Sequence, residues 1–377
     1  MKILWLANVP APYRVSFFNE LGKYCKLKVL FEKRTSDERD DSWCEYKFNN
    51  FDGIILKGKN VNNDTAFCPG VIRYLSKDRY DHIIVTNFTD PTGMIAIEYM
   101  RIMKIPYWLE SDGGFAKDGK GFKERIKTHF IRGAELYLST GVSHSEYYIK
   151  YGANRNRIKL YPFSSIFDSE VLSAPIDALK QKRLREELSI CEEKVVLAVG
   201  QFIFRKGFDV LLNACSNLKG NIGIYFIGGV PTEEYIEIVK KNDLSNVHFI
   251  DYRSKKEILK YYQIADVFVL PTREDIWGLV INEAMCCGTP VISTKQCGAA
   301  LELINDSQNG YIVEAGNSEL LREAIQKVLT CSDIMLLKRN ALETARSHTI
   351  ERMVARHISL FRKTLKEKKC KFNDVNI

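Results

Sequence analysis

The segment LPTREDIWGLVINEAMCCGTPVIS, residues 270–293, combines acidic residues, a glycine and an apolar helix-like stretch. Its order predicts a polar turn, a helix that begins at Gly278, a Gly-Thr-Pro stop and a buried strand at 291–293. The N-terminus of such a helix presents unpaired N–H groups and the positive end of the helix dipole, which suits a phosphate. Glu283, about one turn inside the helix, suits the hydroxyls of a sugar.

A second acid, Asp275, lies eight positions before Glu283. Eight residues of helix would rise roughly 12 Å, whereas the two carboxylates of a glycosidase stand roughly 5–9.5 Å apart. We therefore expect the two acids to hold opposite ends of one long ligand and not to act together on one bond.

Two adjacent cations, Arg205 and Lys206, follow an apolar stretch, VVLAVG at 195–200, and stand directly before Gly207. The stretch is typical of a buried strand, and FDVLLNAC at 208–215 is typical of the helix that follows it. Arginine binds a phosphate through its fork and lysine binds it as a point charge, so the pair is placed to meet a diphosphate. Adjacent cations are also common on solvated loops, but the strand–loop–helix setting favours the phosphate.

Both segments resemble glycosyltransferase family 4, whose signature is E-G-F-G-L-x-x-x-E-A-M-x-x-G-x-P-V and whose phosphate loop is G-x-x-x-x-x-K-G. The leading Glu of the signature falls on Asp275, its first glycine on Ile276 and its aromatic residue on Trp277. The resemblance implies a GT-B fold, in which two doubly wound Rossmann-like domains face a cleft and a C-terminal helix crosses back onto the N-terminal domain. The residues that match the signature are Gly278, Leu279, Glu283, Ala284, Met285, Gly288, Pro290 and Val291.

The resemblance also implies a binding site for a nucleotide sugar, which is a substrate and not a cofactor. Arg205 and Lys206 would neutralise its pyrophosphate, and Glu283 would bind the ribose. Asp275, facing the sugar, is a predicted catalytic residue. Tyr252 would stack on the base or be an ordinary tyrosine of a surface loop. The donor-binding residues expected from the family are Arg205, Lys206, Gly228, Tyr252, Arg253, Gly278, Leu279 and Glu283.

The N-terminal half matches the family less closely. The loop after its first strand, NVPAPYR at 8–14, lacks the glycines that family members often carry there. Arg14 would either reach a phosphate of the donor or acceptor, or be a charge on the surface of a helix. Asp112, in the turn ESDGG at 110–114, is the candidate catalytic residue on the acceptor side, as a base or to orient a hydroxyl. The alternative is a turn aspartate that caps the next segment.

The pattern of acids and histidines favours a metal-independent site. His129 and His144 are expected to be ordinary helix residues. The chain contains no Asp-x-Asp motif, and the most similar sequence is ESD at 110–112. Two cations and a helix N-terminus would neutralise the diphosphate instead. We therefore expect no metal and no cofactor.

The 377 residues suffice for two domains of ordinary size. Alternating strands and helices predict parallel sheets with both faces covered, and a stretch with prolines and serines at 161–190 predicts a linker. We expect an acceptor-binding domain at 1–164, completed by a helix at about 350–377, and a nucleotide-sugar-binding domain at 165–349. The strands are expected at 2–7, 27–31, 82–86, 106–109, 136–140, 159–160, 195–199, 223–227, 247–250, 267–270 and 291–293.

The net charge is +8, and the cations are concentrated in two segments of the chain. At 117–132 the apolar residues Phe122, Ile126 and Phe130 recur at helical spacing among several cations, and 362–371 adds six more cations. A basic amphipathic helix suits an anionic membrane surface, or else packs its stripe into the core with its lysines in solvent. Nucleic acid is not an expected partner, because no nucleic-acid-binding module is recognised. The cations around the stripe are Lys120, Lys123, Arg125, Lys127 and Arg132.

Several features favour a cytoplasmic protein. No run of eighteen apolar residues occurs, and the apolar start of the chain breaks at Asn8 and Pro10, unlike a signal peptide. The ten cysteines are scattered without a C-x2-C pair, which favours reduced thiols. If the basic helix binds lipid, the protein is peripheral on the cytoplasmic face of the membrane.

These features together predict a retaining glycosyltransferase, with retention implied by the family. It would move a sugar from a nucleotide sugar, expected to be a UDP-sugar, to a saccharide or lipid-linked saccharide in bacterial surface polysaccharide synthesis. One alternative is a non-catalytic nucleotide-sugar-binding or membrane-docked scaffold, because the leading acid is an aspartate and the N-terminal glycines are missing. Another is a nucleotide-sugar 2-epimerase of the same fold, which the six scattered histidines do not favour.

Overall fold

The computed structural model describes residues 1–35, 47–117, 119, 121–216 and 218–374, with the side chains of 369 and 371–374 left aside. The chain splits into two compact units. Unit 1 comprises Met1–Ser165 and Ile350–Ile377, and unit 2 comprises Ile166–Thr349. The first boundary lies one residue beyond the expected one, and the second falls where it was expected.

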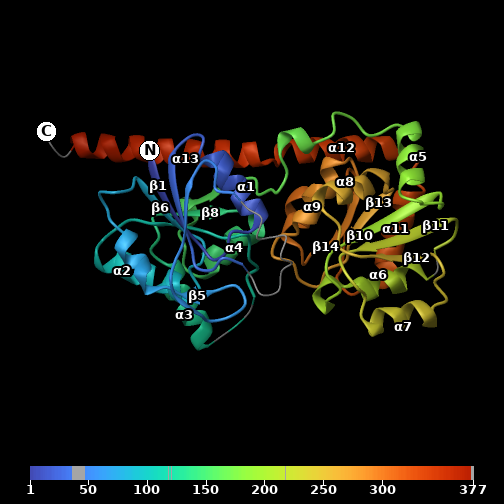
Figure 1. The fold of residues 1–377 in the computed structure, drawn as a ribbon, viewed down its shortest axis with the longest axis horizontal. Helices are drawn as coiled ribbons and strands as arrows, with labels where there is room; N and C mark the ends of the chain where they lie inside the picture. Colours follow the sequence, from blue (N-terminus) through green and yellow to red (C-terminus); the bar gives the residue numbers. More distant parts are fainter. Residues whose placement is uncertain (36–46, 118, 120, 217, 375–377) are drawn as a thin grey trace. The chain divides into compact units, whose positions relative to one another are not determined.

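Unit 1 is built on a seven-stranded parallel sheet with the order β3-β2-β1-β6-β7-β8-β9 (Figure 1). Helices lie on both faces of the sheet, which is why a strand such as β1 is apolar almost throughout. The strands are β1 (Lys2–Ala7), β2 (Lys26–Phe31), β3 (Asp52–Ile55), β6 (His82–Val85), β7 (Trp108–Glu110), β8 (Leu136–Ser139) and β9 (Ile158–Leu160), with a separate antiparallel pair, β4 (Lys59–Asn60) and β5 (Ala66–Phe67). The helices are α1 (Pro12–Leu21), α2 (Pro91–Ile102), α3 (Phe122–Ile131), α4 (Val142–Lys150) and α13 (Ile350–Asp374), with short 3-10 turns η2 (Pro69–Tyr74) and η3 (Arg155–Arg157).

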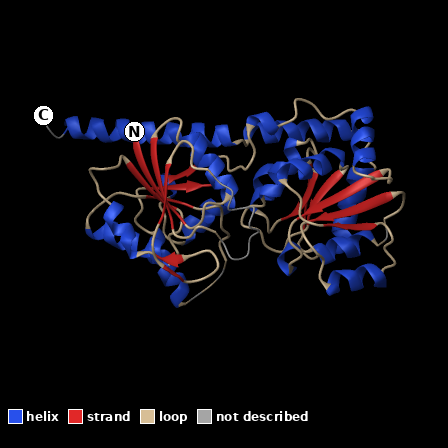
Figure 2. Ribbon diagram, in the orientation of Figure 1, coloured by secondary structure: helices blue, strands red, loops and turns tan. Residues whose placement is uncertain are grey.

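Unit 2 repeats this arrangement on a six-stranded parallel sheet with the order β12-β11-β10-β13-β14-β15 (Figure 2). Its strands are β10 (Lys194–Val199), β11 (Ile222–Ile227), β12 (Val247–Ile250), β13 (Val267–Leu270), β14 (Val291–Thr294) and β15 (Gly310–Val313). Its helices are α5 (Ala178–Glu187), α6 (Phe208–Cys215), α7 (Glu233–Lys241), α8 (Lys255–Ile264), α9 (Leu279–Cys286), α10 (Gly298–Leu303), α11 (Ser318–Leu329) and α12 (Ile334–Ser347), with 3-10 turns η4 (Asp168–Glu170) and η5 (Phe204–Lys206).

The C-terminal helix α13 completes unit 1, where it packs along α1 (Figure 1). Its inner face buries His357 and Phe361 among aromatic rings of the sheet. The imidazole of His357 lies 5.8 Å from the ring of Trp5, and the ring of Phe361 lies 5.3 Å from that of Trp108. The last helix of the chain therefore contributes to the core of the N-terminal unit.

The predicted pair of parallel α/β units is confirmed, and each expected strand is present within two residues of its predicted bounds. The strands that the sequence analysis did not predict are β3, β4, β5 and β15. They are short and only partly buried, so they lack the apolar run by which a buried strand is recognised. Within the described residues, no helix combines the length and apolar character that a membrane crossing requires.

The helix expected within 117–132 is α3, and positions 118 and 120 lie outside the described residues. Phe122 is 77% exposed, whereas Phe130 packs against the core and Ile131 is fully buried. The apolar residues of this helix are therefore divided between solvent and core, so the alternative of a stripe packed wholly into the core does not hold for Phe122.

Candidate active site

The predicted phosphate loop of unit 2 lies in η5, between β10 and α6. Arg205 and Lys206 are its last two residues, and Gly207 follows with φ of 69°. A Cβ atom at Gly207 would stand 2.1 Å from the carbonyl oxygen of Pro271. Only glycine allows this left-handed turn so close to the end of β13, so the sequence Arg-Lys-Gly brings both cations to that strand end.

The segment after β13 holds the phosphate loop in place. Arg273 donates its backbone N–H to the carbonyl of Arg205 at 2.7 Å, and its guanidinium binds both carboxylate oxygens of Asp209 at 2.8 and 2.5 Å. The same guanidinium lies 4.0 Å from the ring centroid of Phe204. A bidentate, stacked arginine of this kind fixes geometry more strictly than a lysine would.

Asp275 lies against the two cations. Lys206 Nζ stands 2.6 Å from Asp275 Oδ2 and Arg205 Nη1 3.7 Å from the same atom, while Arg205 also donates to the carbonyl of Glu274. The side chains of Lys206 and Asp275 are each only 13% exposed. One aspect of the sequence interpretation is corrected: α9 begins at Leu279, so eight residues of helix do not separate Asp275 from Glu283.

The helix α9 begins as the signature predicts. Gly278 is its N-cap with φ of 101°, and a Cβ atom there would stand 2.8 Å from Cys297 Sγ. Leu279 therefore starts a helix whose first N–H groups follow directly on the turn that carries Asp275. Glu283 lies in the second turn, half-buried, and accepts a hydrogen bond from Tyr262 Oη at 3.4 Å.

The remaining donor-binding candidates lie at neighbouring strand ends. Gly228 follows β11 and donates its N–H to Ile250, the last residue of β12. Tyr252 is 47% exposed, and its carbonyl accepts a hydrogen bond from Arg253 Nη1. The strands β10, β11, β12 and β13 are adjacent in the sheet. The loops that follow them carry every predicted donor residue outside α9, so these residues lie at the carboxyl edge of the sheet. Ligands of such sheets bind at this edge.

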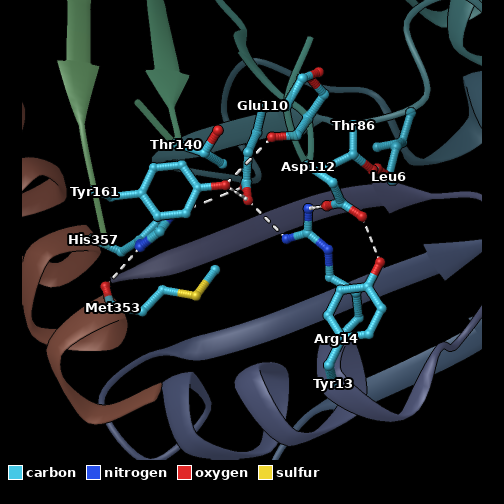
Figure 3. A network of polar contacts seen from close by, with 12 residues as sticks. Leu6, Tyr13, Arg14, Thr86, Glu110, Asp112, Thr140, Tyr161, Met353 and His357 are labelled. Carbon is cyan, nitrogen blue, oxygen red and sulfur yellow. Dashed lines mark hydrogen bonds and ion pairs between the residues drawn. The ribbon is translucent and has the colours of Figure 1, made fainter. Parts of the chain in front are cut away.

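The acceptor-side candidate of unit 1, Asp112, belongs to a buried polar network (Figure 3). Arg14, from α1, donates through Nη1 to Glu110 Oε1 at 2.7 Å and through Nη2 to Asp112. Tyr13 Oη also donates to Asp112, and Tyr161 Oη donates to Glu110 Oε1 at 2.8 Å. The Asp112 side chain is 37% exposed. Its carboxylate is therefore held by Arg14 and Tyr13 and remains accessible to solvent.

Charge, and not only hydrogen bonding, maintains this network. Glu110 is fully buried, and burial alone would raise its pKa, but Arg14 and His357 outweigh burial and lower the pKa to about 2. Arg14 is only 6% exposed. It is therefore not a charge on a helix surface, and it pairs with two carboxylates, Glu110 and Asp112.

His144 supports the turn that carries Asp112. It is fully buried in α4, and burial lowers its pKa to about 3, so the imidazole is neutral. The backbone N–H of Thr140 donates to Nδ1 at 3.2 Å, which leaves the proton on Nε2, 2.8 Å from Ser111 Oγ. Sequence analysis took His144 for an ordinary helix residue, and nothing in its local sequence links it to Ser111. His129, the other such residue, is exposed and pairs with Glu98 on the surface.

A metal site would need several ligating side chains close together. Among the described residues, no group of three or more histidines, cysteines, aspartates or glutamates is placed to hold an ion.

The chain was compared with known proteins. Residues 180–348 match the family model for glycosyl transferases group 1. An uncharacterized glycosyltransferase of Methanocaldococcus jannaschii is 30% identical over 42% of this chain and 45% of its own length, so that this match spans less than half of the relative. The N,N'-diacetylbacillosaminyl-diphospho-undecaprenol alpha-1,3-N-acetylgalactosaminyltransferase of Campylobacter jejuni is 22% identical over 73% of this chain and 74% of its own.

The fold was compared with solved structures. That of Anabaena HepE in complex with UDP superposes with a TM-score of 0.77 and 17% identity, over 95% of this chain and 100% of that one. At this identity the likeness concerns the fold, which is the two-unit GT-B arrangement implied by the signature. The matched segment contains η5, the turn after β13 and α9, so that the phosphate loop and the signature helix lie within it. Residues 180–348 of this chain are therefore similar to the group 1 glycosyltransferases, and the chain has the GT-B fold.

Proposed function

We propose that the protein transfers a sugar from a UDP-sugar to a saccharide or lipid-linked saccharide, with retention at the anomeric carbon. One observation carries the proposal: two cations, a helix N-terminus and Glu283 belong to adjoining segments at the carboxyl edge of the unit 2 sheet. Cations and helix N-termini stabilise a diphosphate, and a glutamate accepts hydrogen bonds from a ribose.

The residues take the following roles. Arg205 and Lys206 bind the diphosphate, for which Lys206 leaves its partner Asp275. Glu283 binds the ribose, and Tyr252, nearly half-exposed, stacks on the base. Asp275 then stands between the diphosphate and the sugar, where it orients the reacting group.

Asp112 acts on the acceptor. Its half-exposed carboxylate accepts a proton from, or orients, the attacking hydroxyl. The buried network behind it keeps the carboxylate in one position, which a base or an orienting group requires. Retention is what the resemblance to family 4 implies, and the configuration of the product tests it.

The relatives support the class of substrates. The C. jejuni relative is named for a lipid-linked diphospho-undecaprenol acceptor, and the HepE structure contains UDP. We extend both substrate classes to this chain and place it in bacterial surface polysaccharide synthesis, on the cytoplasmic side of the membrane, where it needs no metal.

A panel of nucleotide sugars tests the donor. A donor at about 100 times its Kd stabilises the folded protein by about 2.7 kcal/mol, which a thermal melt resolves. Turnover of the best donor with saccharide and undecaprenyl-diphosphate-linked acceptors, followed by NMR of the anomeric proton, then tests transfer and retention. Binding of UDP-sugars without turnover on any acceptor would favour the scaffold, and a 2-epimer of the donor without transfer would favour the epimerase.

A basic surface of unit 1 supports contact with an anionic membrane. Two hollows that share Arg101 and Gly133 are lined by nine cations among other residues, and these cations lie in or directly after α2 and α3, in η3, in β9 and in α13. Beside them Ile102, Met103 and Phe122 are 76%, 54% and 77% exposed. Apolar side chains among cations suit insertion into an anionic interface. The cations that line the basic surface are Arg101, Lys104, Arg125, Arg132, Arg157, Lys159, Arg356, Lys363 and Lys368.

A further inference from the structure

The C-terminal helix places one titratable side chain against the network behind Asp112. His357 Nε2 stands 3.9 Å from Glu110 Oε2 (Figure 3), and both side chains are fully buried. Among the residues that the structure describes, neither of these two atoms has a hydrogen-bond partner. Buried polar atoms are almost always paired, so this facing pair calls for a physical explanation.

The other ring nitrogen determines where the proton of a neutral His357 would be. Nδ1 stands 2.7 Å from the carbonyl oxygen of Met353, which can only accept, so Nδ1 carries a hydrogen. A neutral ring would then turn the bare lone pair of Nε2 toward the carboxylate of Glu110. Two acceptors that face each other without water are unfavourable, whereas a second proton on Nε2 converts the contact into an ion pair.

The charges of the network lead to the same assignment. Asp112 and Glu110 are two anions, and Arg14 is one cation. A protonated His357 makes this network of two anions and two cations neutral as a whole, with Asp112 at its exposed end. The other side chains around the imidazole are the rings of Trp5, Phe17, Tyr161 and Phe361, and the Tyr161 hydroxyl is turned to Glu110.

We propose that His357 is a positioning residue: as an imidazolium it holds Glu110 and, through Glu110 and Arg14, fixes the carboxylate of Asp112. Glu110 Oε1 is held by Arg14 and Tyr161, and His357 is the charged partner that the described part of the chain places at Oε2. Without the imidazolium, the Glu110 carboxylate is free to turn, and Arg14 turns with it because it binds both acids. This inference rests on the proposed role of Asp112 in transfer.

The protonation of His357 is measured independently of activity by 15N NMR of the full chain with labelled histidines at pH 7.5. The His357 signals, identified by their loss in His357→Gln, should show two protonated nitrogens. His144, equally buried but neutral, is the internal control and should show one. If the His357 signals show only one protonated ring nitrogen, the assignment is overturned.

A charge-balanced double variant tests the pairing. His357→Gln leaves Glu110 unpaired, and Glu110→Gln leaves an uncompensated imidazolium. The double variant Glu110→Gln, His357→Gln retains the balanced pair of Arg14 and Asp112, so its Tm should exceed that of either single variant. If the Tm of the double variant does not exceed the Tm of each single variant, the ion pair is contradicted.

Steady-state kinetics test the positioning. His357→Gln should lower kcat about tenfold or more, because small displacements of a reacting group are costly. Its KM for the donor should stay unchanged, since the donor residues belong to unit 2. His348→Gln, the same substitution at a partly exposed site in unit 2, should leave kcat unchanged. An unchanged kcat in His357→Gln would overturn the positioning role. A wild type without transferase activity would overturn the proposed function, while the NMR spectra and melting temperatures would still decide the state of His357.

Discussion

Lys206 Nζ lies 2.6 Å from Asp275 Oδ2, so the cation expected at the diphosphate is paired with the acid expected at the sugar. Both side chains are largely buried, and Arg205 lies near the same carboxylate oxygen. The pair keeps Lys206 extended toward the strand end before a ligand arrives. A diphosphate must then compete with Asp275 for Lys206, so donor affinity depends on the acid as well as on the cations.

The first prediction concerns the two cations. Arg205→Ala and Lys206→Ala should each weaken UDP binding, by roughly 1.5–3 kcal/mol, the range of hydrogen bonds to charged groups. The loss should be larger for Lys206, because it is more buried than Arg205 and its removal leaves Asp275 to repel the diphosphate. Calorimetric titration with UDP measures both. Lys194→Ala, which removes a charge at the opposite end of β10, is the matched control and should bind UDP normally. Normal UDP binding by both site variants would show that the diphosphate lies elsewhere.

The second prediction separates the two acids. Asp275→Asn should bind UDP more tightly, because Lys206 no longer has a competing carboxylate, and should turn over donor more slowly. Glu283→Gln should bind UDP more weakly, because it degrades the hydrogen bonds to the ribose. Titration with UDP and initial rates distinguish the two variants. Glu274→Gln should be mild, since the side chain of Asp275 pairs with both cations, and Arg205 binds Glu274 through the backbone carbonyl, which the substitution keeps. Loss of UDP binding in Asp275→Asn, with normal binding in Glu283→Gln, would reverse this assignment.

The third prediction concerns a residue that touches no expected ligand. Arg273→Lys should weaken UDP binding about tenfold, or about 1.4 kcal/mol, because a lysine keeps the charge but loses both the bidentate pairing with Asp209 and the stacking on Phe204. Arg155→Lys, at an exposed ion pair of unit 1, serves as the control. Equal UDP affinity in Arg273→Lys and the wild type would mean that the phosphate loop does not depend on this arginine.

The position of the candidate donor residues at one edge of the sheet could be predicted from the sequence because these residues are close in sequence to strong strand patterns. The run at 195–199 marks β10, the run at 267–270 marks β13, and the cations and the signature follow directly. Short edge strands such as β3 and β15 escaped prediction because their residues are only partly buried. The pairing of Lys206 with Asp275 joins positions 69 apart in sequence, and no local pattern contains it.

The acceptor side was predicted only in part, for the same reason. Asp112 was recognised from its glycine-rich turn, but the residues that support it come from three other segments of the chain. Arg14 lies in α1, Tyr161 follows β9, and His357 lies in α13. The approach of α13 to the first strands is a tertiary contact between residues over 300 positions apart, which the spacing of apolar residues within one helix does not encode.

The fourth prediction concerns stability at mildly acidic pH. Burial lowers the pKa of His144 to about 3 and that of His82 to about 4, and it also lowers the pKa of His348. In the unfolded chain these groups take up a proton near pH 6.5, whereas His144 and His82 remain neutral in the folded chain until pH 3–4. The unfolded state therefore binds more protons, and the free energy of unfolding should fall as the pH drops below 6.5, by up to about 1.4 kcal/mol per pH unit for each group.

Urea denaturation at pH 7 and pH 5 measures this loss. His144→Gln should be less stable than the wild type at pH 7, but its free energy of unfolding should fall less between the two values, because one of the titrating groups is gone. A free energy of unfolding that is equal at both values would contradict the burial of these neutral histidines.

The last prediction concerns the membrane. Exposed cations beside Phe122 should face anionic headgroups while Phe122 enters the interface, and each cation near such a surface contributes about 1 kcal/mol. Lys127 is a poor target because it pairs with Glu124 and lies over the ring of Tyr151. Lys123 and Arg125 are exposed, so Lys123→Glu with Arg125→Glu should release the protein from anionic vesicles without unfolding α3.

Sedimentation with vesicles rich in phosphatidylglycerol, compared with purely zwitterionic vesicles, measures the binding. High salt should weaken it, because screening shortens the attraction to about 10 Å at 0.1 M. The same charge change in unit 2, Lys180→Glu with Lys182→Glu, alters two exposed cations of α5 and should leave binding unchanged. If both double variants lose binding equally, net charge and not the basic surface attracts the protein. If the wild type does not sediment with anionic vesicles at low salt, Phe122 and its neighbouring cations are a solvated face of α3.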